Sequence, residues 1–376
     1  MDLGFSETQH MLRNAAREFL QQECPRSFVR EMEQNEMGYT LDLWKKIADM
    51  GWLGLVFPEE YGGVGEDFVS LCIVIEEMGR ALFPGPFFSS VVLTGLPISE
   101  YGTDVQRSEF LPRIADGNLV ATLALNERGS SYDPPGVQLE ARSIDSGFVL
   151  NGVKGFVENA NSSSTLLVAA RTQTGSATQG ITLFLVPARA SGLKQDLLDI
   201  SESRKESNLI FRDVLVTNEN ILGDLHGGWA ILKQIIQWGA VAKCAEMIGQ
   251  AEAVLEMTVE YVKQRVQFGR PIGSFQAIQD HCTDMAINLK GARNITYQAA
   301  WRLSQGLPSD LSVAYAKSWV SDAVRHICDL SHQSHGAVAF TREYDLYLYV
   351  NRVKTNEVAF GDGYFHREKV AQLLSL

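Results

Sequence analysis

The sequence predicts a multidomain α and β protein in which a β-barrel separates two helical parts. Helical periodicity runs from Phe5 to about Leu119, and short β-rich runs separated by Gly, Asn, Asp and Ser follow to about Gly223. Longer helical runs return from Gly227 to the end. We therefore expect an N-terminal α-helical domain at residues 1–119, a middle β-barrel domain at residues 120–225 and a C-terminal four-helix-bundle domain at residues 226–376.

Composition is that of an ordinary globular protein. The chain has 376 residues, of which 45% are hydrophobic and 21% charged, enough for two or three domains. No apolar run reaches eighteen residues, and the first residues lack the basic and apolar regions of a secretory signal. We expect a soluble, cytoplasmic protein that inserts into no membrane.

Charge and cysteine content exclude several kinds of function. The net charge is −12, and no cluster of Lys and Arg stands out, which argues against nucleic-acid binding. The five cysteines are scattered and form no C-x-x-C pair, so neither a disulfide framework nor a zinc site is indicated.

Helix signals define both helical parts. Ser6 is positioned to cap the first helix, and further helices are predicted at residues 41–50 and 68–82, the latter ending before Pro84-Gly85-Pro86. Near the other end, helices are predicted at residues 229–267 and 274–305, and the turn Gly306–Ser309 leads into another. Neighbouring long helices favour a bundle.

Five strands are predicted in the middle part, at residues 120–125, 147–150, 165–170, 181–186 and 208–211. Short strands at this spacing are typical of a barrel or sandwich. Asn151-Gly152 stands between two apolar runs, which predicts a two-residue hairpin turn there.

The α–β–α order and several segments resemble the acyl-CoA dehydrogenase family over nearly the whole chain. The most diagnostic segment is Gln264-Arg265-Val266-Gln267-Phe268-Gly269-Arg270-Pro271-Ile272, continued by Phe275-Gln276. The other matching segments are Phe5–Arg13, Gly54–Gly63, Leu150–Lys154, Asp213–Val216 and Leu222-Gly223.

This resemblance implies a function and an assembly. It implies an FAD-dependent enzyme that removes hydrogen from the α and β carbons of an acyl-CoA thioester and passes electrons to an electron-transfer flavoprotein. It also implies a tetramer, either a homotetramer or an α2β2 heterotetramer. The segment Ala245–Gly249 resembles relatives that act on bulky, ring-bearing acyl-CoAs, so both fatty acid and aromatic or alicyclic acyl-CoA degradation are open.

The resemblance also assigns cofactor-binding residues. Arg265 matches an arginine that reaches across a subunit interface to the FAD pyrophosphate, for which a guanidinium fork is well suited. Phe268, Gln276, Gln333 and Gly336 occupy further family positions around the dinucleotide, and a glycine suits close backbone approach. The alternative for Arg265 taken alone is a solvated side chain at a helix end.

In the middle domain, the resemblance assigns Asn126 and Phe156 to the surroundings of the flavin ring. Asn126 stands where the family places a threonine, with a register uncertain by one residue, and Phe156 falls at the aromatic position. Glu158 replaces the threonine that the family places near flavin N5, and we expect its side chain to turn outward.

The catalytic base is the open question, because Phe360 occupies the family's usual glutamate position in the segment Ala359–Asp362. Glu246 is the leading candidate. It shares one helix face with Gly239, Ala242, Gly249 and Ala253, and such a face would let ligand groups approach closely. Small residues also line ordinary helix contacts, and the glutamate could pair with Arg or Lys. Asp362 is the other candidate, and a chain without a competent base is the third possibility.

Three functions therefore remain open: the dehydrogenase, a non-catalytic or half-site partner subunit of a heteromeric acyl-CoA dehydrogenase, and another reaction on the same scaffold, such as an oxidase or desulfinase. His332 and His335 stand one helical turn apart, as metal ligands can. With no third ligand apparent, we expect a structural role for them and no metal.

Overall fold

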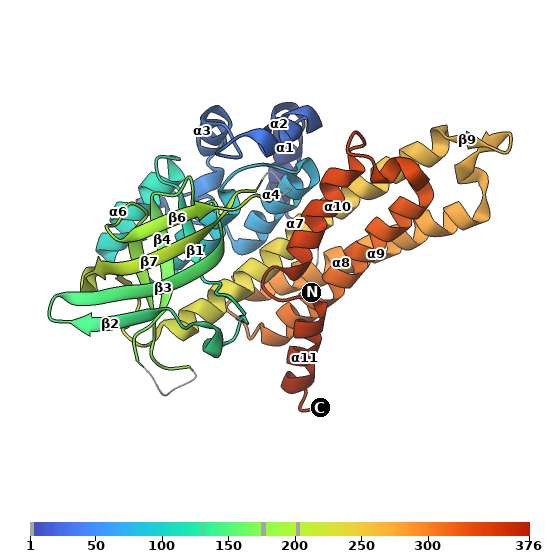
Figure 1. The fold of residues 1–376 in the computed structure, drawn as a ribbon. Coiled ribbons are helices and arrows are strands. Elements are labelled where there is room, and N and C mark those ends of the chain that lie inside the picture. The colour runs from blue at the N-terminus through green and yellow to red at the C-terminus, as the bar shows by residue number, and fades with distance from the viewer. Residues whose placement is uncertain (1–3, 130, 174–177, 201–203) are drawn as a thin grey trace. The chain divides into compact units, whose positions relative to one another are not determined.

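The computed structural model describes residues 4–129, 131–173, 178–200 and 204–376. It confirms the predicted order of a helical part, a sheet part and a second helical part (Figure 1). The residues group into two compact units. The helical unit comprises Met1–Val29, Phe68–Phe83 and Ala240–Leu376, and the sheet unit comprises Arg30–Asp67 and Pro84–Gly239. The residues of the predicted N-terminal domain are divided between the two units, and the domain boundaries at 119 and 225 stay a prediction.

Long helices dominate the helical unit, which also includes a small hairpin. Ser6 caps the first helix through a capping box with Gln9, as expected. The predicted helices end within three residues of their expected limits. The elements are α1 (Glu7–Glu23), α4 (Phe68–Ala81), α7 (Gly228–Gln264, from Ala240 onward in this unit), β9 (Val266–Gln267), β10 (Arg270–Pro271), α8 (Gln276–Ser304), α9 (Asp310–His335), α10 (Leu346–Val358) and α11 (Gly363–Leu373).

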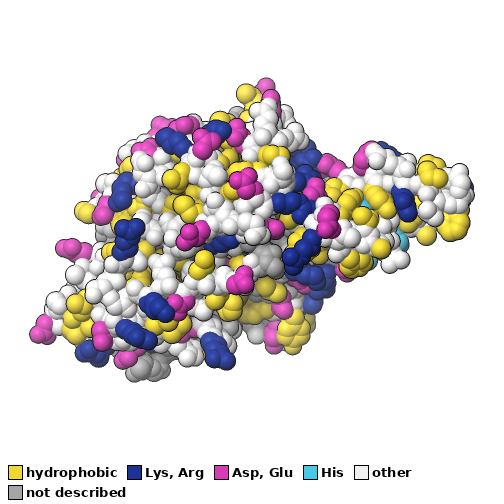
Figure 2. All heavy atoms as spheres, turned by 45° about the horizontal axis from the view of Figure 1, so that its top comes forward, with side chains coloured by type: hydrophobic (Ala, Val, Ile, Leu, Met, Phe, Trp, Pro, Cys, Tyr) yellow, Lys and Arg dark blue, Asp and Glu magenta, His cyan; other side chains and the backbone are white. Residues whose placement is uncertain are grey.

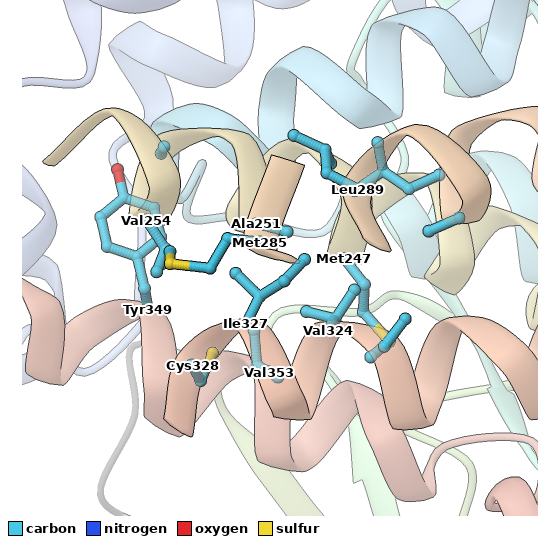
Figure 3. Packing of buried hydrophobic residues seen from close by; sticks show 14 of the residues in the cluster. Met247, Ala251, Val254, Met285, Leu289, Val324, Ile327, Cys328, Tyr349 and Val353 are labelled. Atoms are coloured by element: carbon cyan, nitrogen blue, oxygen red, sulfur yellow. The ribbon is translucent and has the colours of Figure 1, made fainter. Parts of the chain in front are cut away.

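The core of the helical unit lies between α7, α8, α9 and α10 (Figure 3). Each helix contributes side chains at helical spacing, so one apolar face of each points inward. Those labelled in Figure 3 are Met247, Ala251, Val254, Met285, Leu289, Val324, Ile327, Cys328, Tyr349 and Val353. Within the described part of the chain, no helix has the length and apolar character needed to cross a membrane.

A buried charge cluster joins four helices of the same unit. The Glu76 and Glu77 side chains on α4 are only 1% exposed. Glu77 accepts hydrogen bonds from Arg13 and Arg17 of α1, and Glu76 accepts from Arg13 and from Arg293 and Tyr297 of α8. Glu252 of α7 pairs with Arg17 at 3.0 Å. Because each of these carboxylates contacts arginine, the three acidic side chains are stabilised as ion pairs.

The sheet unit contains one mixed sheet with helices preceding it in the chain. Each predicted strand overlaps an observed strand, and the predicted helix at residues 41–50 is α3 (Leu41–Asp49). The strands are β1 (Ala121–Ala124), β2 (Glu140–Ile144), β3 (Gly147–Glu158), β4 (Thr165–Arg171), β5 (Ile181–Pro187), β6 (Leu193–Leu197), β7 (Glu206–Val216) and β8 (Ile221–Leu222). Further helices are α5 (Leu96–Tyr101) and α6 (Asp104–Ala115), while α2 (Arg26–Gln34) spans the boundary between the units.

The strand order is β6-β7-β3-β2-β4-β5-β8, with β1 paired in parallel to β4. No ladder within the described residues joins β6 to β8, so hydrogen bonding leaves the predicted barrel open. Side chains from one face form the core of this unit, among them Leu150, Val168, Phe184, Leu209 and Val214.

The predicted hairpin turn at Asn151-Gly152 is wrong, because β3 runs through both residues. The turn lies earlier, at Asp145-Ser146, where Ile144 of β2 pairs with Gly147 of β3. Asn151-Gly152 instead marks a register shift against β7, where Gly152 has φ +139°. The Asn151 side chain bonds both the backbone and the side chain of Asp213, so its turn-forming chemistry stabilises a bulge.

Candidate functional site

Arg265 directly follows α7 and precedes the β9–β10 hairpin, and its side chain is exposed. Gln267 pairs with Arg270, which leaves Phe268 and Gly269 as a two-residue turn. Both turn residues have positive φ, +53° and +78°, as in a type I′ turn. The Ile272 N–H donates to the Arg265 carbonyl at 2.8 Å, so the backbone of Arg265 is fixed while its guanidinium reaches outward.

Phe268 at this turn is 90% exposed, and Figure 2 shows hydrophobic side chains on the surface of the projecting part that carries β9 in Figure 1. Its ring contacts Phe275 edge-on at 6.1 Å between centroids, and the Arg270 guanidinium lies 4.2 Å above the Phe275 ring. Gln276 begins α8, is exposed and donates to Asp280 at 2.8 Å. The predicted residues Arg265, Phe268 and Gln276 thus lie in and beside one hairpin.

Gln333 and Gly336 lie at the C-terminal end of α9. Gly336 has φ +70° and ψ −144°, a combination that essentially only glycine adopts. A Cβ added at Gly336 would meet no atom within 4 Å, so glycine is required by conformation and the space beside it is open. Both residues line a cavity of about 600 Å³, within the size range of small-molecule sites.

The lining of this cavity offers mixed chemistry. Lys354 and Asp329 contribute opposite charges, Asn351 an amide and Phe340 an aromatic side chain that is 75% exposed. The remaining lining residues are His332, Ala337, Ala339, Tyr347 and Val350. A cation, amides and an aromatic surface are the groups that bind phosphate, polar ring edges and a flat ring.

The two histidines each bond to their own helix. His332 Nδ1 lies 2.9 Å from the Cys328 carbonyl oxygen, and His335 Nδ1 lies 2.8 Å from that of Ser331. The His335 ring also stacks on Tyr261 at 4.4 Å between centroids, and burial lowers its pKa. These contacts support the structural role expected for the pair.

In the sheet unit, Asn126 and Phe156 lie close together through the backbone. The Gly155 N–H donates to the Asn126 carbonyl at 2.8 Å, and Phe156 follows at once. Phe156 has φ +53°, lies in a register shift between β3 and β7 and is 62% exposed. An exposed aromatic ring on a bulge beside Asn126 is available to a ligand. Glu158 is half-buried near the end of β3, and its carbonyl accepts from the Thr122 hydroxyl at 2.6 Å.

A buried ion pair between Lys154 and Glu127, which adjoins Asn126 in sequence, was not predicted. Lys154 is fully buried, and its Nζ lies 2.6 Å from Glu127 Oε1. Burial lowers the Lys154 pKa to about 8, with Glu127 opposing the shift. The available signal was Lys154 itself, a lysine inside a strand that is apolar on both sides of it.

Glu246 is buried on α7, and its carboxylate is engaged by neighbours. Lys243 Nζ donates to Oε2 at 3.1 Å, Gln250 Nε2 donates to Oε1 at 3.2 Å, and Arg352 Nη1 lies 3.8 Å from Oε1. Gly249 on this helix face serves packing, because a Cβ added there would lie 1.8 Å from the Glu76 carbonyl oxygen of α4. At this level of α7, the glycine and alanine face therefore contacts a helix.

Hydrogen bonds fix the segment that holds the other candidate base, Asp362. Phe360 is buried with φ +58°, and Lys317 Nζ donates to the carbonyls of Glu357 at 2.7 Å and Gly361 at 2.9 Å. The exposed Asp362 caps α11, because its carboxylate accepts from the Phe365 N–H at 2.8 Å. Asp362 thus has a structural use that accounts for its presence.

Family models match along most of the chain. The N-terminal domain of acyl-CoA dehydrogenase matches residues 6–118, the middle domain matches residues 122–214 and the C-terminal domain matches residues 226–374.

Individual relatives agree with these matches. A probable acyl-CoA dehydrogenase of Bacillus subtilis, YngJ, is 30% identical, with each chain fully covered. Butyryl-CoA dehydrogenase from Megasphaera elsdenii superposes with a TM-score of 0.92 at 28% identity, again with full coverage of both chains. A chain in a structure of the electron transferring flavoprotein of Acidaminococcus fermentans superposes with the same score at 29% identity, covering all of this chain and 99% of that one. This chain belongs to the acyl-CoA dehydrogenase family.

Proposed function

We propose that this chain is an FAD-dependent dehydrogenase that converts an acyl-CoA thioester to the 2-enoyl-CoA and delivers the electrons to an electron-transfer flavoprotein. The observation that carries the proposal is the cavity of about 600 Å³ lined by Gln333 and Gly336, two of the residues assigned to the dinucleotide. Membership in the family supplies the reaction class, and the match at 29% identity to a chain in an electron transferring flavoprotein structure supports the proposed acceptor.

The residues present fit FAD. The Gly336 conformation leaves open space on its Cα, the Arg265 guanidinium is exposed for a pyrophosphate, and Phe156 and Asn126 form an accessible edge for a flat ring. Bound FAD would supply the two-electron acceptor for the hydride that leaves the β carbon. The protein has to hold the dinucleotide, orient the thioester and remove the α-proton.

We assign removal of the α-proton to Glu246. Its carboxylate is buried, which shields it from water, and Lys243 and Gln250 fix its two oxygens in one orientation. To act as base, one carboxylate oxygen of Glu246 must accept the α-proton of the bound thioester.

A substitution at this position tests the assignment. Glu246→Gln retains the side-chain shape, so the purified protein should keep its yellow colour and FAD-to-protomer ratio. Saturated acyl-CoAs with short, long and ring-bearing acyl groups should bleach the wild-type flavin and leave that of the variant unchanged. Normal bleaching in Glu246→Gln would show that Glu246 is not the base. Asp362→Asn is the matched control, because the amide oxygen can still cap α11.

A second candidate function is a half-site partner subunit in a heteromeric α2β2 assembly. One observation favours it: each candidate base has a structural use, since Glu246 is paired with Lys243 and Asp362 caps a helix. Such a chain would lend Arg265 and Gln333 to a flavin held mainly by another subunit. Purified alone it would be colourless and would gain FAD only with its partner, whereas the dehydrogenase proposed above would be yellow as a homotetramer.

A further inference from the structure

We propose that Lys154 and Glu127 form a positioning pair that fixes the flavin-facing edge of the sheet unit, the segment Leu125–Glu127 together with Phe156. The pair lies behind this edge and does not itself contact the cofactor. The inference rests on the proposed FAD-dependent function and assigns a further role to residues of the same site.

The pair joins three separate segments at one carboxylate oxygen. Lys154 Nζ donates to Glu127 Oε1 at 2.6 Å and to the Leu125 carbonyl at 3.0 Å. The same Glu127 oxygen accepts from the backbone N–H groups of Gln138 at 2.9 Å and Leu139 at 3.0 Å. The end of β1, strand β3 and the chain leading into β2 are therefore held at one point.

Both flavin-facing residues are adjacent to this point. Asn126 lies between the two anchored residues Leu125 and Glu127, and its carbonyl accepts from the Gly155 N–H at 2.8 Å. Phe156 lies two residues after Lys154, at a register shift that begins at Lys154. Displacing the Lys154 side chain would free the Leu125 end of the Asn126 segment and the start of the bulge that presents Phe156, while Gln138 and Leu139 would still hold Glu127.

The energetics favour a positioning role over a stabilising one. Lys154 is fully buried, and desolvation opposes its charge, as the lowered pKa of about 8 indicates. Replacing a buried ion pair by neutral groups of similar size is often neutral or stabilising for a fold. An apolar side chain at position 154 cannot donate the hydrogen bond that the Leu125 carbonyl accepts from Lys154.

Two variants isolate this hydrogen bond. Glu127→Gln removes the charge but keeps an amide oxygen for Lys154, Gln138 and Leu139. The double variant Lys154→Met with Glu127→Gln keeps that oxygen for the two backbone groups and removes the donor to Leu125. Lys194→Met is the matched control on β6 of the same sheet, where the lysine side chain is 66% exposed.

The measurements are FAD dissociation constants by fluorescence titration of the stripped full-length protein, its visible flavin spectrum, and thermal unfolding midpoints of the stripped protein. We expect Lys194→Met to stay within threefold of wild type in FAD affinity, and Glu127→Gln is the reference for the double variant. The double variant should fold with a thermal unfolding midpoint near that of Glu127→Gln. It should bind FAD at least tenfold more weakly than Glu127→Gln and show an altered visible flavin band.

Equal FAD affinity in the double variant and in Glu127→Gln would overturn the inference. A double variant that fails to fold would overturn it as well, because the pair would then serve stability. The proposed function fails separately, if wild-type protein binds no FAD either alone or with a partner subunit.

Discussion

Gly249 of α7 lies against the backbone of Glu76 in α4, so closely that an added Cβ would be 1.8 Å from the Glu76 carbonyl oxygen. A reciprocal contact places Gly79 of α4 against the Glu246 backbone. The two glycines therefore let two helices of the helical unit cross with their backbones nearly touching. The crossing explains why small residues recur on the α7 face that includes Glu246.

Gly249→Ala should destabilise the protein, although alanine is the better helix former. The methyl group has no room beside a backbone atom, so the helices must move apart; we expect a loss of about 2–4 kcal/mol in the free energy of unfolding. Gly291→Ala on α8 is the control, because its Cβ would lie 3.5 Å from Trp319 Nε1, an ordinary contact, and should be neutral or stabilising. Urea unfolding of both variants and of wild type tests this prediction. Equal stability of Gly249→Ala and wild type would refute the tight crossing.

Lys317→Met should loosen the segment that carries Phe360 and Asp362. Lys317 is buried, and its hydrogen bonds to the Glu357 and Gly361 carbonyls fix the end of α10 and the following turn. Without them, amide hydrogen exchange at residues 358–363 should accelerate at least tenfold while exchange in α7 changes little. Lys290→Met, at an exposed position on α8, is the control. Unchanged exchange at residues 358–363 would contradict the proposed constraint.

Stability should fall on acidification because of His366. Burial lowers its pKa from 6.5 to about 4, so the unfolded chain binds a proton that the folded chain does not. The stabilising effect is complete above pH 6.5 and is lost as the pH falls towards 4, by an amount on the order of 3 kcal/mol.

His366→Gln provides the comparison. The amide can still donate to the Phe360 carbonyl, which accepts from His366 Nε2 at 2.9 Å. Thermal unfolding between pH 4 and 7 should show a weaker pH dependence in this variant than in wild type. His10→Gln, at an exposed position, should retain the wild-type dependence, and parallel curves for all three proteins would refute the assignment.

Much of the fold was predictable because its signals are local. Helix limits follow from caps and apolar periodicity, as at Ser6 and Leu41, and the longer strands follow from apolar runs such as Thr165–Arg171. β2 and β6 were missed because both are rich in charged and polar residues and are largely exposed. The Asn151-Gly152 signal failed because the Asn151 side chain bonds Asp213, 62 residues further along the chain, and so stabilises a bulge in place of a turn.

The spatial grouping of the candidate site residues was predictable only where sequence neighbours form the group. Arg265, Phe268 and Gln276 lie around one hairpin, so a contiguous motif identifies them together. The partners of Glu246 are different: Arg352 comes from another helix more than a hundred residues away, and the packing of Gly249 depends on α4. Lys154 on β3 is likewise paired with Glu127, which follows β1 in a separate segment, and no single-segment pattern reports such a contact.

Phe268→Asn should weaken the association between subunits without destabilising the fold of the single subunit. Phe268 holds the first position of a type I′ turn with φ +53°, where Asn is preferred, so the substitution should relieve about 1 kcal/mol of local strain. Within its own chain, this 90% exposed ring gains only the edge-on contact with Phe275 among the ring contacts of the described residues. Burying such a ring against another subunit is worth about 1.5–3 kcal/mol.

Losing that burial should weaken assembly at least tenfold per contact. Sedimentation measurements across a concentration series would follow the assembly, and the FAD-to-protomer ratio should fall with it if Arg265 beside Phe268 completes the site across an interface. The control is Leu215→Asn, since Leu215 on β7 is 67% exposed and far from the hairpin in sequence. Wild-type assembly by Phe268→Asn would mean that the exposed ring contacts no subunit, and the strain at the turn would then need a ligand to account for it.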